Sequence, residues 1–364
     1  MRDKIKVYLQ YPWKFPDSPY YKYLINSPPK NIEFRNTQKQ KGVIINKNFF
    51  WFSNFLKRNI RKFANALNLS IANSHLSPNE NYDLIHCAHC LSKNKNKPWI
   101  ADIESSWQLY IGKETIKNKK KVKKILLNKN CKKIISWTEY TKTDILKKFP
   151  EMENKIEVVY PAIPKKEMKK EMKKKNIVLV FSGRYFYQKG GLHALIAMNK
   201  LTKKYENIRA IFQSEVPHEI LEKYSQNKKI KFYGLISQEK LFDIYEKSDI
   251  LIYPGYSDTF GFAYLEAMSF GLPIITVDGF AKKEIVCHGK TGFIIPKKFE
   301  YPEKIEEIDT DIIKSIMNKT SLLIENKKLR EKMSKNCRKL IKDGKFSIKE
   351  RNKKLNRIYQ ESLK

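Results

Sequence analysis

The chain of 364 residues is 41% apolar, which is enough to build two hydrophobic cores of ordinary size. Its 73 Lys and Arg residues against 38 Asp and Glu give a formal net charge of +35, so we expect either a polyanionic partner or a solvated lysine surface produced by compositional bias. No segment approaches the roughly 18 consecutive apolar residues of a membrane-spanning helix, and residues 1–11 indicate a strand rather than a signal peptide. These features predict a cytoplasmic protein, and its five scattered cysteines predict free thiols.

Short runs of Ile and Val alternate with longer segments of helical periodicity along the whole chain. Alternation of this kind is typical of parallel sheets covered by helices. The fold class is therefore predicted to be α/β, with a separate sheet in each half. The predicted strands are residues 4–9, 84–87, 99–103 and 133–137 in the first half, and residues 177–182, 209–213, 250–254 and 273–277 in the second.

Residues 49–67 predict an amphipathic helix with an aromatic start. Phe52, Phe55 and Phe63 share one face with aliphatic residues, and basic residues lie opposite. This is the pattern of an interfacial membrane helix, and equally that of a surface helix packed on a sheet. Residues 117–133 add a basic run without a single acid, so the first half is a candidate for binding an anionic membrane surface.

Residues 86–90 read HCAHC and suggest a zinc site at first sight. Neighbouring residues of a strand point to opposite faces, however, so one pentapeptide is not expected to surround an ion with four ligands. We predict no metal site, and we expect His86 and His89 to line a cleft between domains or to pack there. Glu104, after the third strand, either binds a ligand or caps the following helix.

A change of composition between the halves predicts a domain boundary. Pro161 and Pro164 are followed by the lysine-rich residues 165–175, which indicates a linker. We therefore predict a first domain over residues 1–164 and a second over residues 165–346.

A glycine-containing basic turn opens the second half. Residues 181–192 read FSGRYFYQKGGL, so Gly183 follows a predicted strand and permits close backbone approach. Arg184 and Lys189 are two cations on one loop, suited to binding a phosphate-containing ligand.

A second loop follows the predicted strand 250–254. Residues 253–295 indicate a strand, a polar turn, a helix and another strand. Such a turn presents backbone N–H groups and a helix N-terminus at the end of a sheet. Asp258 and Glu266 supply two carboxylates in this span, and ionised carboxylates accept short hydrogen bonds from sugar hydroxyls.

The final segment, residues 347–364, predicts a C-terminal helix. Leu355, Ile358, Tyr359 and Leu363 lie on one helical face, so we expect the helix to pack back on the domains.

Both loop motifs resemble those of retaining glycosyltransferase family four, the glycosyl transferases group 1. Asp258, Phe260, Gly261 and Glu266 occupy the places of the family's E-x7-E motif, with Asp258 where Glu is commoner. The resemblance implies a GT-B fold: two Rossmann-like domains that face each other across a cleft, the first binding the acceptor and the second the nucleotide sugar.

The resemblance also implies roles for the matched residues. Arg184 and Lys189 would act on the diphosphate, and Asp258 would hold hydroxyls of the donor sugar, which makes these three the predicted catalytic residues. Glu266 would accept hydrogen bonds from the ribose, and residues 232–239 resemble the stretch near the nucleotide base. The predicted donor-binding residues are Gly183, Gly234, Leu235, Phe260, Gly261 and Glu266. On the acceptor side the predicted residues are Glu104, which would hydrogen-bond the acceptor or the donor sugar if it does not cap the helix, and His89.

Two segments depart from the family pattern. Residues 10–21 read QYPWKFPDSPYY, with prolines where a glycine-rich turn is common, so we expect acceptor binding to be built differently. Residues 212–214 read FQS where glycine is often found, which leaves the base undetermined.

The sequence thus predicts a retaining, metal-independent hexosyltransferase that uses a nucleoside diphosphate sugar as donor substrate and no cofactor. The acceptor is expected to be a glycan or lipid-linked molecule of cell-surface glycan or glycolipid synthesis, reached from the cytoplasmic face of the membrane. In the mechanism that the resemblance implies, the leaving phosphate itself accepts the proton of the acceptor. A sugar-nucleotide epimerase on the same fold and a basic nucleic-acid-binding protein remain alternatives, although dispersed basic residues and the lack of a standard module argue against nucleic acid.

Overall fold

The computed structural model describes residues 4–11, 19–37, 71–167, 176–297 and 308–364, together with residues 52, 55, 56, 58–60, 62, 63 and 66. The chain forms two compact units: Met1–Ala162 with Ile348–Lys364, here called the N-terminal unit, and Ile163–Ser347, here called the C-terminal unit. The first boundary falls at residue 162, next to the prolines that indicated a linker. The last helix belongs to the N-terminal unit alone.

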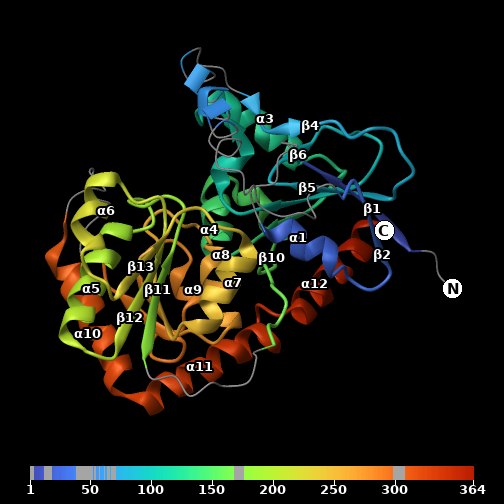
Figure 1. Cartoon of the computed structure of the whole chain (residues 1–364). Coiled ribbons are helices and arrows are strands. Elements are labelled where there is room, and N and C mark those ends of the chain that lie inside the picture. Colours follow the sequence, from blue (N-terminus) through green and yellow to red (C-terminus); the bar gives the residue numbers. More distant parts are fainter. Residues whose placement is uncertain are drawn as a thin grey trace. The chain divides into compact units, whose positions relative to one another are not determined.

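A six-stranded parallel sheet forms the centre of the N-terminal unit, in the order β10-β9-β7-β5-β1-β2 (Figure 1). β5 and β7 are buried along their whole length, which explains their continuous apolar sequences. The strands are β1 (Ile5–Gln10), β2 (Ile32–Arg35), β5 (Leu84–Ala88), β7 (Trp99–Ile103), β9 (Cys131–Ser136) and β10 (Ile156–Val158). Short pairs are β3 (Ile71–Ala72) with β8 (Tyr110–Ile111), and β4 (Ser74–His75) with β6 (Leu91–Ser92).

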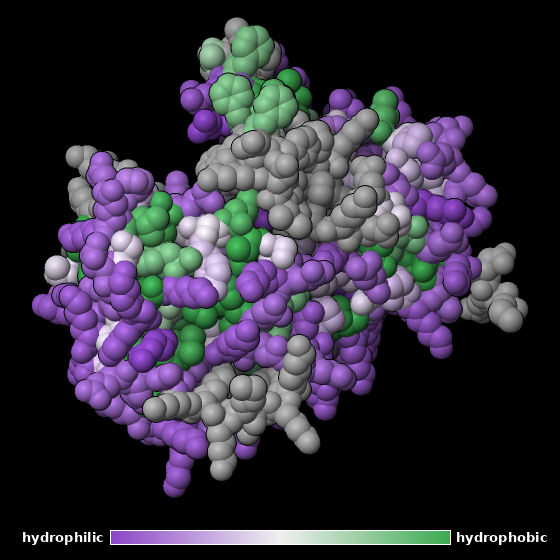
Figure 2. Space-filling model, in the orientation of Figure 1, coloured by the Kyte–Doolittle hydropathy of each residue, from purple (hydrophilic) through white to green (hydrophobic). Residues whose placement is uncertain are grey.

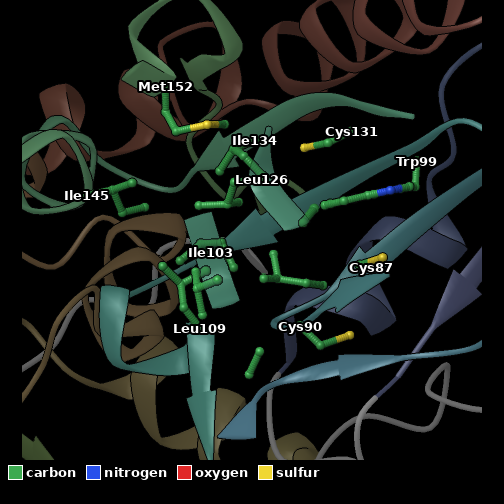
Figure 3. Packing of buried hydrophobic residues seen from close by; sticks show 14 of the residues in the cluster. Cys87, Cys90, Trp99, Ile103, Leu109, Leu126, Cys131, Ile134, Ile145 and Met152 are labelled. Carbon is green, nitrogen blue, oxygen red and sulfur yellow. The ribbon is translucent and has the colours of Figure 1, made fainter. Parts of the chain in front are cut away.

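The helices of this unit cover the sheet and close its core. Thr115 and Thr138 cap the helices that follow them, since their hydroxyls accept bonds from the backbone N–H of Asn118 and Thr141. Figure 3 shows part of the buried cluster between strands and helices, with Trp99, Leu126, Ile134 and Met152 among its members. The helices are α1 (Pro19–Asn26), η2 (Ser106–Leu109), α3 (Ile116–Leu126), α4 (Glu139–Lys148), η3 (Pro150–Lys155) and α12 (Ile348–Ser362).

The C-terminal unit repeats this design with a second six-stranded parallel sheet, in the order β13-β12-β11-β14-β15-β16. Its strands are β11 (Ile177–Ser182), β12 (Ile208–Gln213), β13 (Ile230–Tyr233), β14 (Ile250–Ile252), β15 (Ile274–Val277) and β16 (Gly292–Ile295). Its helices are α5 (Gly191–Lys204), α6 (His218–Ser225), α7 (Gln238–Lys247), α8 (Phe262–Ser269), α9 (Lys282–Ile285), α10 (Thr310–Glu325) and α11 (Lys327–Lys342).

Helix α12 packs on the N-terminal unit through its apolar stripe. Leu355, Ile358 and Tyr359 are buried, whereas Leu363 lies beyond the end of the helix and is 41% exposed. Leu363 therefore does not extend the buried stripe as its spacing suggested. Polar contacts add to this packing, because Arg351 Nη2 donates to the Ser27 carbonyl at 2.6 Å.

All five cysteines are free thiols, and four of them are buried. No helix in the described part of the chain is long and apolar enough to cross a membrane.

Candidate functional site

Two loops of the C-terminal unit lie at the carboxyl end of its sheet, where the strand order reverses. β11 pairs with β12 on one side and with β14 on the other. The strands β12 and β13 are therefore added on one side of β11, and the later strands, from β14 on, are added on the opposite side. We call residues 183–190, after β11, the basic loop, and residues 253–261, after β14, the acidic loop. In open α/β sheets, such a switch point is where ligands bind.

Backbone hydrogen bonds join the two loops directly. The Gly255 N–H donates to the Lys189 carbonyl at 3.0 Å, and the Ser257 N–H donates to the Gln188 carbonyl at 3.1 Å. The Lys189 ammonium forms an ion pair with Asp258 and lies 3.5 Å from Ser257 Oγ. The structure therefore brings together Lys189 and Asp258, two predicted catalytic residues that are 69 positions apart in the sequence.

Glycines permit this close approach. A Cβ on Gly183 would lie 3.0 Å from Lys189 Cβ, and one on Gly190 would lie 2.5 Å from Pro254 Cβ. Gly190 and Gly261 have φ angles of +75° and +84° and stand directly before α5 and α8. Because glycine adopts this backbone at no steric cost, both helices can begin at the edge of the sheet.

Asp258 keeps one oxygen without a protein partner. Its side chain is 11% exposed, and within the described residues Oδ2 is buried without a hydrogen bond. Burial raises the pKa of the neighbouring Tyr253 well above its usual value, and the charge of Asp258 raises it further. Tyr253 therefore stays neutral, and Asp258 Oδ2 is available to accept a hydrogen bond from a ligand hydroxyl.

Arg184 and Phe260 differ in how much of each residue is exposed to solvent. Arg184 is partly exposed and directly follows Gly183 in the basic loop. Phe260 is 1% exposed, and its ring contacts those of Phe262 and Phe346 with centroids 5.3 and 6.4 Å apart. Since the Phe260 side chain belongs to the core, its predicted contact to the donor is limited to backbone atoms.

Glu266 lies on α8 and is 6% exposed. Its Oε1 accepts a hydrogen bond of 2.9 Å from Gln238 Nε2 at the start of α7. Burial raises the pKa of Tyr245, and the charge of Glu266 adds to the effect. The structure thus fixes one carboxylate oxygen of Glu266 by a hydrogen bond from a neutral side-chain amide.

Gly234 and Leu235 follow β13 and are tied to the end of β12. The Leu235 N–H donates to Glu215 Oε1 at 3.1 Å, and Gln213 Nε2 donates to the Gly234 carbonyl at 2.9 Å. Ser182 Oγ in turn donates to Gln213 Oε1 at 2.7 Å. Glu215 was not predicted, although its position just after a strand of the sheet is the signal that could have identified it.

Lys282 is a second residue that the sequence did not single out, since it is hidden among many lysines. It begins α9, after β15, and its side chain is 1% exposed. Burial lowers its pKa from 10.5 to about 8, opposed by the nearby charge of Asp258 and reinforced by that of Lys189. A third loop at the same sheet edge therefore contributes a buried amine.

In the N-terminal unit, Asp102 at the end of β7 is the centre of a buried polar network. Asp102 Oδ2 lies 3.1 Å from His86 Nε2, and Asp102 Oδ1 accepts from the Tyr21 hydroxyl at 2.7 Å. Burial alone raises the pKa of Asp102, but the bond from His86 and the proximity of His89 outweigh it and hold the pKa below its usual value. The ionised Asp102 accepts from His86, so His86 Nδ1 accepts from the Tyr359 hydroxyl at 2.8 Å.

His89 and Glu104, the residues predicted for the acceptor side, lie close to this network. His89 has a φ of +55°, its N–H donates to Asp102 Oδ1 at 3.2 Å, and its ring contacts those of Tyr21 and Trp137. The Glu104 N–H donates to Gln108 Oε1 at 2.9 Å, and Ser105, not Glu104, is the N-cap residue of η2. The described residues contain no group of three or more His, Cys, Asp or Glu that could hold a metal ion.

Comparisons with known proteins relate the chain to one family and one fold. Residues 163–340 match the model of the family described as glycosyl transferases group 1. The chain is 29% identical over 167 residues to an uncharacterized 41.2 kDa protein of the cps region of Klebsiella pneumoniae, covering 43% of this chain and 45% of that protein. It is 28% identical over 196 residues to the capsular polysaccharide biosynthesis glycosyltransferase CapM of Staphylococcus aureus, covering 52% and 47%. The chain thus spans less than half the length of these relatives.

Solved structures share the fold over the whole chain. A glycosyltransferase from Rickettsia africae superposes with a TM-score of 0.66 at 15% identity, covering 100% of both chains. HepE from Anabaena, in complex with UDP, superposes with a TM-score of 0.63 at 14% identity, covering 98% of this chain and 99% of that one. Two Rossmann-like parallel sheets in one chain are the GT-B fold. We conclude that residues 163–340, which make up most of the C-terminal unit, form a domain of the glycosyl transferases group 1 family.

Proposed function

We propose that the protein transfers a hexosyl group from a nucleoside diphosphate sugar to an acceptor, with retention of the anomeric configuration and without a metal ion. The observation that carries the proposal is the ion pair between Lys189 and Asp258 at the switch point of the C-terminal sheet. It joins one group suited to a diphosphate and one suited to sugar hydroxyls in a single site.

The chemistry assigns each charged group to one part of the donor. Arg184 and Lys189 stabilise the negative charge that develops on the leaving diphosphate, because cations fixed in place before the reaction need little reorganisation. Asp258 Oδ2 accepts from a hydroxyl of the sugar, and Glu266 accepts from the ribose hydroxyls. Lys189 pairs with Asp258 before the donor arrives, and then shares its ammonium with the diphosphate.

The proton of the acceptor hydroxyl goes to the leaving phosphate in this proposal. The described part of the donor site shows Asp258 and Glu266 already engaged with Lys189 and Gln238, so neither is proposed as the general base. His89 and Glu104, in the N-terminal unit, are proposed to hydrogen-bond the acceptor rather than to take its proton.

The acceptor is proposed to be a glycan or lipid-linked molecule of cell-surface glycan synthesis. CapM, one of the relatives, is a capsular polysaccharide glycosyltransferase, and WaaG, which shares the fold with a TM-score of 0.59, is involved in lipopolysaccharide biosynthesis. Acceptors of this kind are assembled at membranes, which fits a chain with a formal net charge of +35.

The N-terminal unit is proposed to meet an anionic membrane surface. Phe52, Phe55, Ile60 and Phe63 are between 45% and 64% exposed, and Figure 2 shows apolar side chains gathered at the upper end of the view. Of the two interpretations of residues 49–67, packing of this face in the core does not hold for the described residues. α3 adds an exposed Ile116 and six lysines: Lys117, Lys119, Lys120, Lys121, Lys123 and Lys124.

The first experiment is a thermal-shift panel of the purified full chain with UDP, GDP, ADP and their sugars. A ligand that binds only the folded state raises the melting temperature, so one nucleoside diphosphate and its sugar should raise it while the matching nucleoside does not. No shift with any of the three diphosphates would refute the proposed function.

A further inference from the structure

The loop after β15 brings a third cation to the edge of the sheet that holds the basic and acidic loops. β15 pairs with β14 on one side and β16 on the other, so residues 278–282 follow the same carboxyl edge. The Lys282 side chain is 1% exposed, its Nζ lies 3.4 Å from the Gly279 carbonyl oxygen, and it lies 5.4 Å from the centre of the Phe280 ring.

The charged groups that face Lys282 come from four loops. They are Asp258 after β14, Lys189 after β11, Asp278 after β15 and Lys297 after β16. Both carboxylates are already engaged, because Asp258 pairs with Lys189 and Asp278 lies 2.8 Å from Lys283 Nζ. Within the described residues, Lys282 has no ion pair of its own.

Burying a charged amine without a counter-ion costs free energy of folding, and packing alone does not require an amine at this position. An apolar side chain of similar length would fill the same space without the desolvation cost. Asp258 Oδ2, a charged neighbour of Lys282, is also buried without a hydrogen-bond partner. A buried ammonium without an ion pair and a carboxylate oxygen without a hydrogen bond, both at one sheet edge, indicate a ligand that has both an anion and hydroxyls.

We propose that Lys282 binds the diphosphate of the donor nucleotide, as a third cation beside Arg184 and Lys189. The inference rests on the proposed function and adds to it a residue that neither basic motif contains. In the free protein, Lys189 is paired with Asp258, whereas Lys282 has no ion pair among the described residues. The diphosphate completes the coordination of the Lys282 ammonium when it binds.

Proton uptake follows from this arrangement. The free Lys282 amine has its pKa lowered to about 8, whereas a bound diphosphate favours the charged ammonium. Binding therefore selects the protonated form, which is abundant below pH 8 and is lost as the pH rises. The affinity for a nucleoside diphosphate should fall about tenfold between pH 7 and pH 9, the ratio of the protonated fractions.

The test is calorimetric titration. The wild-type full chain is first titrated with UDP, GDP and ADP, and the variants are then titrated with the diphosphate that binds the wild type. Lys282→Met should lower the affinity at pH 7 about tenfold or more and should remove the fall between pH 7 and pH 9. Lys282→Arg should keep most of the affinity and also lose the pH dependence, since a guanidinium stays charged. Lys283→Met is the matched control, because Lys283 is 74% exposed, and it should bind like the wild type with the same pH dependence.

The outcomes separate the inference from the proposed function. Unchanged affinity and an unchanged pH profile in Lys282→Met would overturn the role of Lys282 while leaving the proposed function intact. An effect of the substitution on a sugar carboxylate donor such as UDP-glucuronate, with none on UDP, would also overturn it. Failure of the wild type to bind any of the three diphosphates would refute both. If melting curves show Lys282→Met to be unfolded, the flat pH profile expected of Lys282→Arg decides alone.

Discussion

Lys189 and Asp258 form an ion pair in the free protein. In the proposed donor complex, the Lys189 ammonium also contacts the diphosphate and the Asp258 carboxylate also contacts the sugar. Lys189→Ala removes the cation and leaves Asp258 without compensation. We expect turnover to fall roughly a hundredfold, comparable to the loss of one oxyanion donor, and Arg184→Ala to behave similarly. Steady-state kinetics would show the loss in kcat. A change confined to the apparent affinity for the acceptor would contradict the assignment of both cations to the leaving group.

Glu266 accepts a hydrogen bond from Gln238, and its carboxylate is proposed to bind the ribose of the donor. Glu266→Ala should weaken donor binding and reduce transfer about tenfold or more, on the scale of one charged hydrogen bond. Gln238→Ala serves as the comparison, because it removes the protein partner while it keeps the carboxylate. Equal losses in both variants, measured by titration with the donor nucleotide, would mean that the bond between α7 and α8 matters rather than the ribose contact.

Lys282 should also reduce the stability of the free protein. Its folded-state pKa of about 8 lies below the usual value of 10.5, so the unfolded chain binds more protons between these two pH values and stability rises with pH across that window. Below pH 8 the full cost remains, up to about 3 kcal/mol. Lys282→Met should therefore unfold at higher urea concentration at pH 7, with a smaller gain at pH 10. A variant less stable than the wild type at pH 7 would contradict this.

At the residue scale, the sequence allowed the charged loop residues to be predicted because parallel strands end at one edge. Arg184, Lys189 and Asp258 each follow a recognisable strand, which is why their loops could be expected to meet. Glu215, Asp102 and Lys282 were missed for a physical reason. Each acts through a partner on another strand or loop, and single acids or lysines in a chain that is 30% charged carry no local signal.

At the scale of elements, the exposed side chains of Phe52, Phe55, Ile60 and Phe63 allow a direct test of the proposed membrane contact. Replacing both Phe52 and Phe63 with Ser should reduce co-sedimentation with anionic vesicles, because these side chains are 57% and 64% exposed and can bury apolar area at the headgroups. Binding of the wild type should rise with the anionic lipid fraction and fall with salt, since exposed lysines are screened. Trp51, in the same predicted helix, lies outside the described residues.

The control for this test is folding. Leu363→Ser changes another exposed apolar side chain of the N-terminal unit, and it should leave vesicle binding unaltered. If the double serine variant melts well below the wild type, these side chains stabilise the fold and the membrane proposal fails. If it stays folded and still sediments with vesicles, lipid contact lies elsewhere.

The strands were easier to predict from the sequence than the full extent of the sheets. Strands rich in Ile and Val, such as β11 and β12, were predicted within a residue of their ends, because burial on both faces requires continuous apolar runs. β2 and β13 were not predicted. They are short edge strands with alternating polar residues, and their assignment depends on the neighbouring strand rather than on their own sequence.

At the scale of the whole chain, the amphipathic pattern of α12 predicted that it packs but not on which unit. The contact between α12 and the N-terminal unit includes a hydrogen bond between the buried Tyr359 hydroxyl and His86 of β5, a residue 273 positions earlier. Tyr359→Phe leaves the His86 nitrogen without its donor and should lower stability by about 1–3 kcal/mol, the cost of an unsatisfied buried group. Urea unfolding would measure this. No change in stability would mean that another group replaces the hydroxyl.

The return of α12 also fixes an order of events during protein synthesis. Residues 163–347 leave the ribosome before residues 348–364, so the C-terminal unit can fold while the N-terminal unit still lacks its last helix. Until then His86, the Ser27 carbonyl and the apolar surface beneath Leu355 and Ile358 have no partners from α12. The half of the protein that is made first is therefore completed last, and a premature stop codon at residue 348 would damage the N-terminal unit while leaving residues 163–347 complete.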